Sequence, residues 1–92
     1  MDNRIMTKHP QGKKGVNILQ SKYEFIKNAI LDQLKGVEEM SYQELTNILE
    51  RKLKDEFDGK VAWYVVSVKL DLEARGIIMR VPKSKPHRLR II

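Results

Sequence analysis

The chain contains no cysteine, and its longest uninterrupted apolar runs are only a handful of residues. The absence of cysteine excludes disulfide scaffolds, thiolate zinc sites and cysteine nucleophiles, and it fits a reducing compartment. Such short runs fall far below the roughly 20 apolar residues that a membrane-spanning helix needs. Met1 to Ile5 also lack the apolar stretch of a secretory signal. We therefore expect a cytoplasmic protein with no membrane partner.

Acidic residues are absent beyond Glu73, although six basic side chains follow it. Residues 60–92 hold eight basic and two acidic side chains and carry +6, whereas residues 21–59 carry −3 and residues 1–20 carry +3. A field of one sign attracts polyanions and raises the rate at which they are encountered. The charge distribution favours a nucleic-acid partner, with a merely solubilising tail as the alternative.

Signatures of catalysis are also missing from the sequence. It contains neither the glycine-rich fingerprint of nucleotide-hydrolysing loops nor that of dinucleotide-binding folds. His9 and His87 lie in loop-like segments without a carboxylate at metal-ligand or catalytic-triad spacing. The pair Lys13-Lys14, flanked by glycines, could cradle a phosphate through backbone N–H groups, but an ordinary exposed turn has the same composition. We expect a binding protein and not an enzyme, with no cofactor.

Two amphipathic helices are predicted by their capping signals. Ser21 with Glu24, and Ser41 with Glu44, each match a capping box at the start of a helical pattern. Apolar residues then repeat at helical spacing on one face of each segment: Ile26, Ile30 and Leu34 in the first, and Leu45, Ile48, Leu49 and Leu53 in the second. Gly36 is placed to end the first helix.

The segment from Val61 to Arg75 combines strand-favouring valines with helical spacing. Val61, Val65, Val68 and Leu72 fall on one helical face, and Gly76 follows as a terminator. This spacing predicts a third helix. Residues 77–81 and 88–91 then read as strands joined by a loop at 82–86, which makes a hairpin with a basic tip. Residues 1–20 are turn-rich and predict an N-terminal arm or strand in front of a single domain at 21–92.

The predicted order of three helices and a two-stranded hairpin is the plan of a winged helix-turn-helix, in an α+β fold that is mainly helical. The segment from Leu70 to Arg80, LDLEARGIIMR, resembles the end of the recognition helix and the start of the wing in many such regulators. In those proteins the leucine fills the core, the glycine turns the chain and the aliphatic pair begins the wing. This resemblance implies a winged-helix fold.

The chain as a whole also resembles a family of small, uncharacterised bacterial proteins with a winged-helix-like fold. Four segments carry the resemblance: His9–Val16 (HPQGKKGV), Phe57–Gly59 (FDG), Trp63-Tyr64, and Val68–Gly76 (VKLDLEARG). It covers almost the full length and implies the fold, but it brings no activity with it.

A duplex DNA partner suits this plan, because the third helix would enter the major groove and the wing would contact the backbone or minor groove. The predicted nucleic-acid-binding residues are Lys60, Tyr64, Ser67 and Lys69 on the helix, and Arg80, Lys83, Lys85, Arg88 and Arg90 on the wing. The helix has few arginines and no asparagine or glutamine, so we expect a small transcriptional regulator that makes phosphate contacts with limited base readout. Asp71 is expected on its outer side, where it would repel phosphate.

A second apolar stripe, Trp63, Val66 and Leu70, runs beside the predicted core face of the third helix. The N-terminal segment could cover it with Ile5, Val16 and Ile18. Alternatively it is a partner surface for a second copy or another protein, because exposed apolar patches mark interfaces. This second interpretation leads to the alternative function, a winged-helix protein-interaction or dimerisation module that does not bind DNA.

Overall fold

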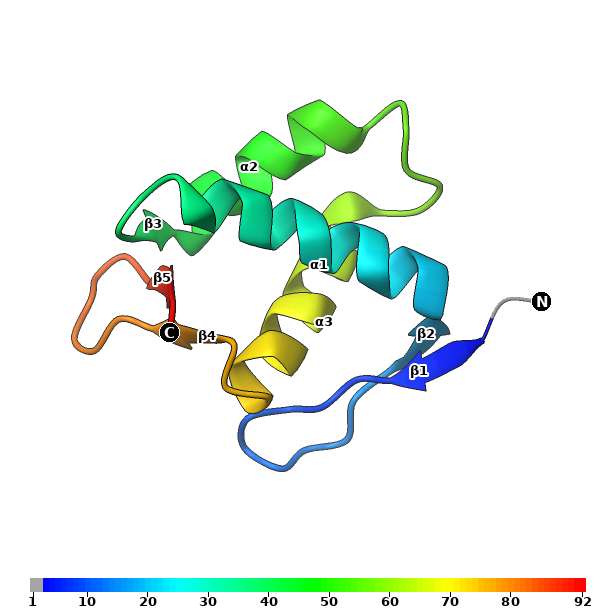
Figure 1. Cartoon of the computed structure of the whole chain (residues 1–92), viewed down its shortest axis with the longest axis horizontal. Coiled ribbons are helices and arrows are strands. Elements are labelled where there is room, and N and C mark those ends of the chain that lie inside the picture. The colour runs from blue at the N-terminus through cyan, green and yellow to red at the C-terminus, as the bar shows by residue number, and fades with distance from the viewer. Residues whose placement is uncertain (1–2) are drawn as a thin grey trace.

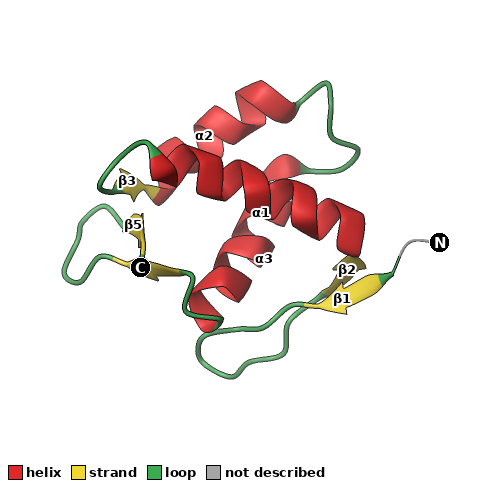
Figure 2. Cartoon of the chain, in the orientation of Figure 1, coloured by secondary structure: helices red, strands yellow, loops and turns green. Residues whose placement is uncertain are grey.

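Three helices and two small antiparallel sheets make up residues 3–92, which are the residues described by this computed structural model (Figures 1 and 2). The helices are α1 (Gln20–Lys35), α2 (Tyr42–Leu53) and α3 (Val61–Ala74). The strands are β1 (Arg4–Met6), β2 (Asn17–Leu19), β3 (Met40–Ser41), β4 (Ile78–Arg80) and β5 (Arg88–Ile91). The predicted α+β class with mainly helical content is confirmed. No helix within residues 3–92 has the length and apolar character to cross a membrane.

The buried cluster lies where the three helices meet and continues into the second sheet. α1 contributes Tyr23, Ile26, Ile30 and Leu34; α2 contributes Leu45, Leu49 and Leu53; α3 contributes Val61, Val65, Val68 and Leu72. Ile18, Met40, Ile78 and Leu89 complete it. The predicted apolar faces of all three helices are therefore confirmed, and tertiary packing overrides the strand propensity of the valines in α3.

The start of α1 differs from the prediction that Ser21 caps it. The helix begins at Gln20, and Leu19 occupies the N-cap position without a side-chain hydrogen bond. The cause is the strand in front, because β2 runs directly into the helix and keeps Leu19 extended. The Gln20 N–H donates to the carbonyl of Asn3 (2.6 Å), which satisfies one of the free donors of the first turn.

The ends of the other helices match their sequence signals. The Ser41 side chain caps α2 by accepting from the Glu44 N–H (3.1 Å). At the end of α3, Gly76 adopts a left-handed φ of 75°. Its N–H donates to Glu73 O (3.1 Å) and that of Ile77 to Leu72 O (3.0 Å), which is the Schellman pattern. This turn directs the chain from α3 straight into β4.

The second sheet has three strands in the order β3-β5-β4, all antiparallel. The predicted hairpin supplies β4 and β5, whereas β3 was not predicted and is only two residues long. Met40 pairs with Leu89, and Ser41 pairs with Arg88. β3 therefore ties the segment between α1 and α2 to the C-terminal hairpin.

The N-terminal segment forms a hairpin of its own, β1-β2, with Ile5 opposite Ile18. Ile18 is in the buried cluster, and Ile5 and Val16 pack against it. The loop between the two strands extends beneath the C-terminal end of α3 in Figure 1. α3 is thus bordered by the N-terminal loop on one side and the β4–β5 hairpin on the other.

Candidate nucleic-acid interface

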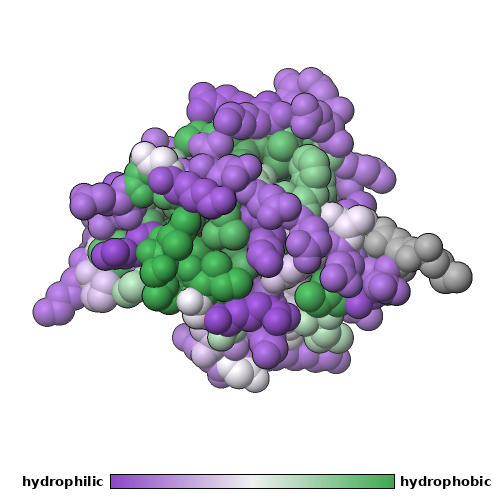
Figure 3. Space-filling model, in the orientation of Figure 1, coloured by the Kyte–Doolittle hydropathy of each residue, from purple (hydrophilic) through white to green (hydrophobic). Residues whose placement is uncertain are grey.

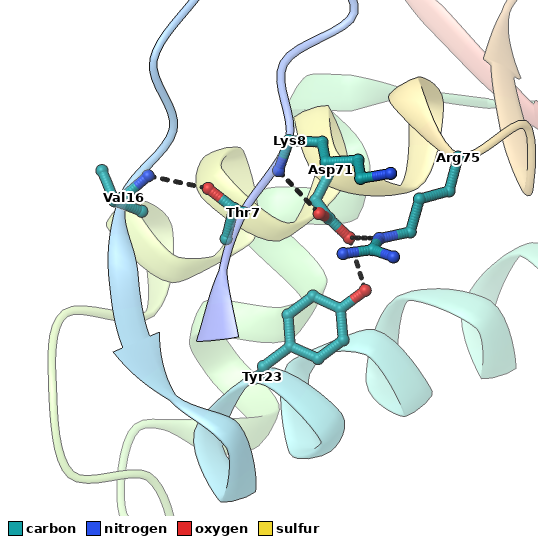
Figure 4. A network of polar contacts seen from close by, with 6 residues as sticks. All are labelled: Thr7, Lys8, Val16, Tyr23, Asp71 and Arg75. Carbon is teal, nitrogen blue, oxygen red and sulfur yellow. Dashed lines mark hydrogen bonds and ion pairs between the residues drawn. The ribbon is translucent and has the colours of Figure 1, made fainter. Parts of the chain in front are cut away.

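Asp71 lies at the centre of a buried polar network that joins three parts of the chain (Figure 4). Its side chain is fully buried. The carboxylate accepts hydrogen bonds from the Lys8 backbone N–H (2.8 Å), from the Tyr23 hydroxyl and from Arg75 Nε (2.8 Å). The expectation that Asp71 faces outward is therefore wrong. Its helical position turns it toward α1 and the N-terminal loop, and there it cannot repel an approaching phosphate.

The two side-chain partners of this carboxylate, Tyr23 and Arg75, have shifted pKa values. Burial, and then the hydrogen bond to Asp71, raise the pKa of Tyr23 well above its ordinary value. The hydrogen bond to Asp71 also raises the pKa of Arg75. Tyr23 stays neutral and its hydroxyl donates a hydrogen bond to the carboxylate, while Arg75 supplies the compensating positive charge. The ion pair with Arg75 therefore places a positive charge directly beside the buried carboxylate.

The N-terminal loop is locked in place by Thr7, which is buried. Its N–H donates to Val16 O (2.8 Å), and its Oγ1 accepts from the Val16 N–H (2.9 Å). A Cβ on Gly15 would lie only 1.8 Å from the Thr7 carbonyl oxygen, so no larger residue fits here without a shift. Together with the Lys8–Asp71 bond, these contacts hold the loop against α3.

Two of the predicted contact residues on α3, Ser67 and Lys69, are buried. The Lys69 ammonium lies 3.0 Å from Glu73 Oε1 and 5.3 Å from the centre of the Tyr42 ring. It therefore has an internal partner and is not presented to solvent. Their burial follows from the many elements around α3, which leave it little free surface near its C-terminal end.

The other two predicted contacts on α3 lie near its N-terminus. Lys60 is exposed just before the helix. Tyr64 is half-buried, with its ring 4.9 Å from the rings of both Phe57 and Trp63. A Cβ on Gly59 would come within 2.8 Å of the Tyr64 ring, so the Asp58-Gly59 turn closes directly on it. Among the described residues, Lys60 is the free cation at this end of the helix.

The stripe formed by Trp63, Val66 and Leu70 is divided by the N-terminal loop. Trp63 is 44% exposed, whereas Val66 and Leu70 are half-buried. Leu70 lines a small cavity under the N-terminal loop, together with Gly15 and Val16. The loop thus shelters the end of the stripe near Leu70 and leaves Trp63 open.

Four of the five predicted cations of the β4–β5 hairpin are exposed. They are Arg80, Lys83, Lys85 and Arg90. Within residues 3–92 none of these four makes an ion pair, and the hairpin itself contains no acidic residue. The hairpin therefore presents a concentrated positive surface.

The fifth cation, Arg88, forms an ion pair with a carboxylate that lies beside the neighbouring strand β3. Its Nε lies 2.7 Å from Glu39 Oε1, and its Nη2 donates to the Glu39 carbonyl (3.4 Å). Glu39 immediately precedes β3, so the strand that the sequence did not reveal places this acid beside Arg88. Much of the positive field of Arg88 is neutralised in this way.

The tip of the hairpin is ordered by Ser84, which the sequence did not single out. Its Oγ donates to Val81 O (2.7 Å) and accepts from the Arg88 N–H (3.1 Å), while the Val81 N–H donates to Arg88 O (2.9 Å). Lys83 adopts a positive φ of 60° between these bonds. The cations of the tip are therefore carried on a closed turn and not on a free chain.

His87 lies at the base of the hairpin, half-buried and stacked on Tyr42 at 5.7 Å. Burial lowers its pKa, and the charges of Lys69 and Arg80 lower it further, although Glu73 opposes them. Its Nε2 lies 3.9 Å from Glu73 Oε1. The neutral imidazole fills the junction between α2, α3 and the hairpin.

Apolar and polar surface are segregated on the face seen in Figure 3. Apolar residues gather beside β4 and β5, and polar residues cover α2 and the outer side of α1. Among the exposed large apolar side chains, Ile92 follows β5 and Val37 follows α1. The hairpin cations therefore border an apolar surface at this end of the molecule.

The fold and these surfaces define a small, mainly helical α+β domain with a basic hairpin and an ordered N-terminal loop. The chain belongs to a family of unknown function, DUF6958, whose model matches residues 4–89. The predicted membership of an uncharacterised family is confirmed. No curated protein and no solved structure matches the chain significantly.

Proposed function

We propose that this chain is a winged-helix module that binds duplex DNA mainly through the phosphate backbone. The order α1, β3, α2, α3, β4, β5 supports the fold assignment, because the helices precede a hairpin that follows the third helix directly. In this assignment α3 is the recognition helix and the β4–β5 hairpin is the wing.

The observation that carries the proposal is the set of four cations on the wing that make no ion pair within residues 3–92. Arg80, Lys83, Lys85 and Arg90 are exposed, and no carboxylate of the wing competes with an incoming phosphate. Cations of this kind displace the counterions that surround DNA, which supplies affinity without regard to sequence. The ordered tip limits the conformational entropy that the wing loses on binding.

α3 adds little direct base readout to this surface. Its outward side carries Trp63 and Val66, and Ser67 and Lys69 are turned inward. Lys60 remains as a phosphate contact at the N-terminus of the helix. Without arginine, asparagine or glutamine on that side, discrimination between bases through hydrogen bonds is weak. The proposed role is therefore a DNA-binding module of low sequence selectivity.

The test is a fluorescence anisotropy titration of an arbitrary labelled duplex at about 50 and 200 mM salt. The four wing cations and Lys60 give a slope of about −4.5 in the log-log plot, which is roughly a 500-fold loss of affinity over that range. Removing the cations one at a time lowers the slope by about 0.9 for each. The matched control is the double variant Lys52→Ala and Lys54→Ala, which removes two exposed cations of α2 and its C-cap. Absence of binding at tens of micromolar protein in low salt overturns the proposal.

A second candidate function, self-association, is favoured by the aromatic end of the molecule. Phe25, Phe57, Tyr64 and Trp63 form a continuous row of ring contacts between 4.9 and 5.7 Å. The two outer members, Phe25 and Trp63, are 41% and 44% exposed. Solvent-exposed aromatic rings in a row are typical of interface anchors.

Charge complementarity points to a second copy as the occupant of this surface. The row is bordered by acidic residues, Glu56 and Asp58, and by the basic residues Lys22 and Lys60. In a twofold interface the same patch meets itself, and a patch that carries both signs can place opposite charges face to face. The wing, which carries one sign, would repel its own copy.

Sedimentation equilibrium separates this candidate from the first. If two copies meet at the aromatic row, Trp63→Gln weakens the dimer by roughly tenfold or more, as expected for an interface anchor. Val37→Gln, at a comparably exposed apolar residue elsewhere, leaves the dimer intact. A wild-type chain that stays monomeric at hundreds of micromolar eliminates this candidate.

A further inference from the structure

A cleft of about 470 Å³ opens between the N-terminal loop and the C-terminal end of α3. It is lined by loop residues that include Lys8, His9, Gly12, Lys13 and Lys14, and by Ala74 of α3. A smaller cavity of about 80 Å³ shares several of these residues and reaches Ser67 and Leu70. The volume of the cleft falls within the range of small-molecule sites, which is roughly 300 to 1,000 Å³.

The charge of this cleft is uncompensated. Lys8, Lys13 and Lys14 are exposed and make no ion pair within the part of the chain that the structure describes. Asp71 is the carboxylate that binds the loop among the described residues, and it is buried and already accepts three hydrogen bonds. Only the backbone of Lys8 binds that carboxylate, so its ammonium stays available. The three ammonium groups therefore attract an anion into the cleft.

Backbone donors accompany the lysines. Within residues 3–92, the N–H groups of Lys13, Lys14 and Gly15 donate to no protein acceptor. Successive free N–H groups in a turn make a concave site for anions. A ligand phosphate could accept hydrogen bonds from several of them at once.

The loop is shaped before any ligand arrives. The Gly12 N–H donates to His9 O (2.9 Å), and the Gln11 N–H donates to His9 Nδ1 (3.1 Å). Because Nδ1 accepts this hydrogen bond, Nε2 is left as the donor nitrogen of the His9 ring beside the cleft. Thr7 and Gly15 fix the opposite side of the loop. Binding therefore requires little additional ordering of the chain.

We propose that this cleft binds a phosphate group, with Lys8, Lys13, Lys14 and the free backbone N–H groups as its ligands. The apolar walls at Met6 and Ala74 suit the body of the molecule that carries the phosphate. That molecule is either a small phosphorylated compound or a nucleic-acid backbone, and the two sources share the same chemistry at the loop. The site is separate from the wing, and it does not depend on the DNA-binding proposal.

The experiment follows the ¹⁵N amide signals of residues 12–15 in the full chain. Three probes are titrated at constant ionic strength: inorganic phosphate, adenosine 5′-monophosphate and a short duplex. The expected result is a saturable shift of the Lys13, Lys14 and Gly15 amides, with affinity reduced roughly tenfold or more in the double variant Lys13→Ala and Lys14→Ala, because two charge-assisted hydrogen bonds are lost. The double variant Lys52→Ala and Lys54→Ala keeps the wild-type affinity.

The outcomes separate the two sources of phosphate and also separate this site from the wing. Shifts with the two small probes identify a small-molecule site, whereas shifts with the duplex alone identify a backbone contact. Both support the phosphate site, including when wing variants show no role in binding DNA. Amides that move no more with any probe than with chloride overturn it. Signals in the rest of the spectrum report whether the loop variant is still folded.

Discussion

The Tyr23 hydroxyl donates a hydrogen bond to the buried carboxylate of Asp71, which lies 48 residues further along the chain. Tyr23 is in the first turn of α1, and Asp71 is near the end of α3. The same carboxylate receives the Lys8 N–H and Arg75, so one buried charge joins α1, α3 and the N-terminal loop. A carboxylate in such a position is tolerated because these three donors satisfy it.

Replacing Tyr23 with phenylalanine removes one of these donors and changes little else in shape. We expect the free energy of unfolding to fall by about 1–3 kcal/mol, because a buried carboxylate loses one hydrogen bond. Chemical denaturation with urea measures the change. Tyr42→Phe is the control, since the Tyr42 hydroxyl donates no hydrogen bond within residues 3–92. Equal stabilities for the two variants would contradict a structural role for the Tyr23–Asp71 bond.

Stability should also fall in mild acid through His87. Its pKa is lowered in the folded protein, first by burial and then by Lys69 and Arg80. The unfolded chain therefore takes up the proton near the ordinary value of about 6.5, while the folded chain does so only at lower pH. The stabilisation from neutral His87 is therefore fully present above about pH 6.5. It is lost as the pH falls from there through the lowered pKa of His87 in the folded protein. His87→Gln should lose less stability than wild type between pH 7.5 and 5.5 in urea titrations, and an equal loss would exclude His87 as the cause.

Gly15 should be far more sensitive to substitution than Gly36. A Cβ at Gly15 meets the Thr7 carbonyl at 1.8 Å, whereas nothing lies within 4 Å of a Cβ at Gly36. Gly15→Ala must displace the backbone of the N-terminal loop, at a cost of about 1–3 kcal/mol. Gly36→Ala, at a helix C-cap with ordinary helical φ, should stay within about 0.5 kcal/mol of wild type. Thermal unfolding of both variants provides the comparison.

Local signals in the sequence were sufficient for most of the helical framework. The apolar spacing of α1, α2 and α3 places their core residues correctly, and Ser41 and Gly76 mark helix ends where the structure has them. Such signals work because capping and amphipathic burial depend on residues only a few positions apart. The N-terminus of α1 is the exception. There a preceding strand displaces the capping position that Ser21 would otherwise take.

The features that the sequence did not reveal depend on contacts between distant segments. Asp71 faces inward because Tyr23 and Lys8 come to it from elsewhere in the chain. β3 has two residues, too few for an alternating pattern, and it exists because β5 pairs with it. Glu39, which immediately precedes β3, then forms an ion pair with Arg88, 49 residues away. The residues of such pairs lie far apart in the sequence, and no local pattern relates them. Which side chains of the candidate site are buried or paired could therefore not be predicted from the sequence.

Arg90 and Arg88 should differ in their contribution to DNA affinity, although they stand two positions apart in one strand. Arg90 is exposed and unpaired in the part of the chain that the structure describes, whereas Arg88 is held by Glu39 at 2.7 Å. Arg90→Ala should therefore lower the salt slope of binding by about 0.9, and Arg88→Ala by clearly less. Glu39→Gln, which frees Arg88, should raise affinity at about 50 mM salt. Anisotropy titrations of the three variants decide the point, and identical slopes for the two arginine variants would mean that Glu39 does not shield Arg88 from the phosphates.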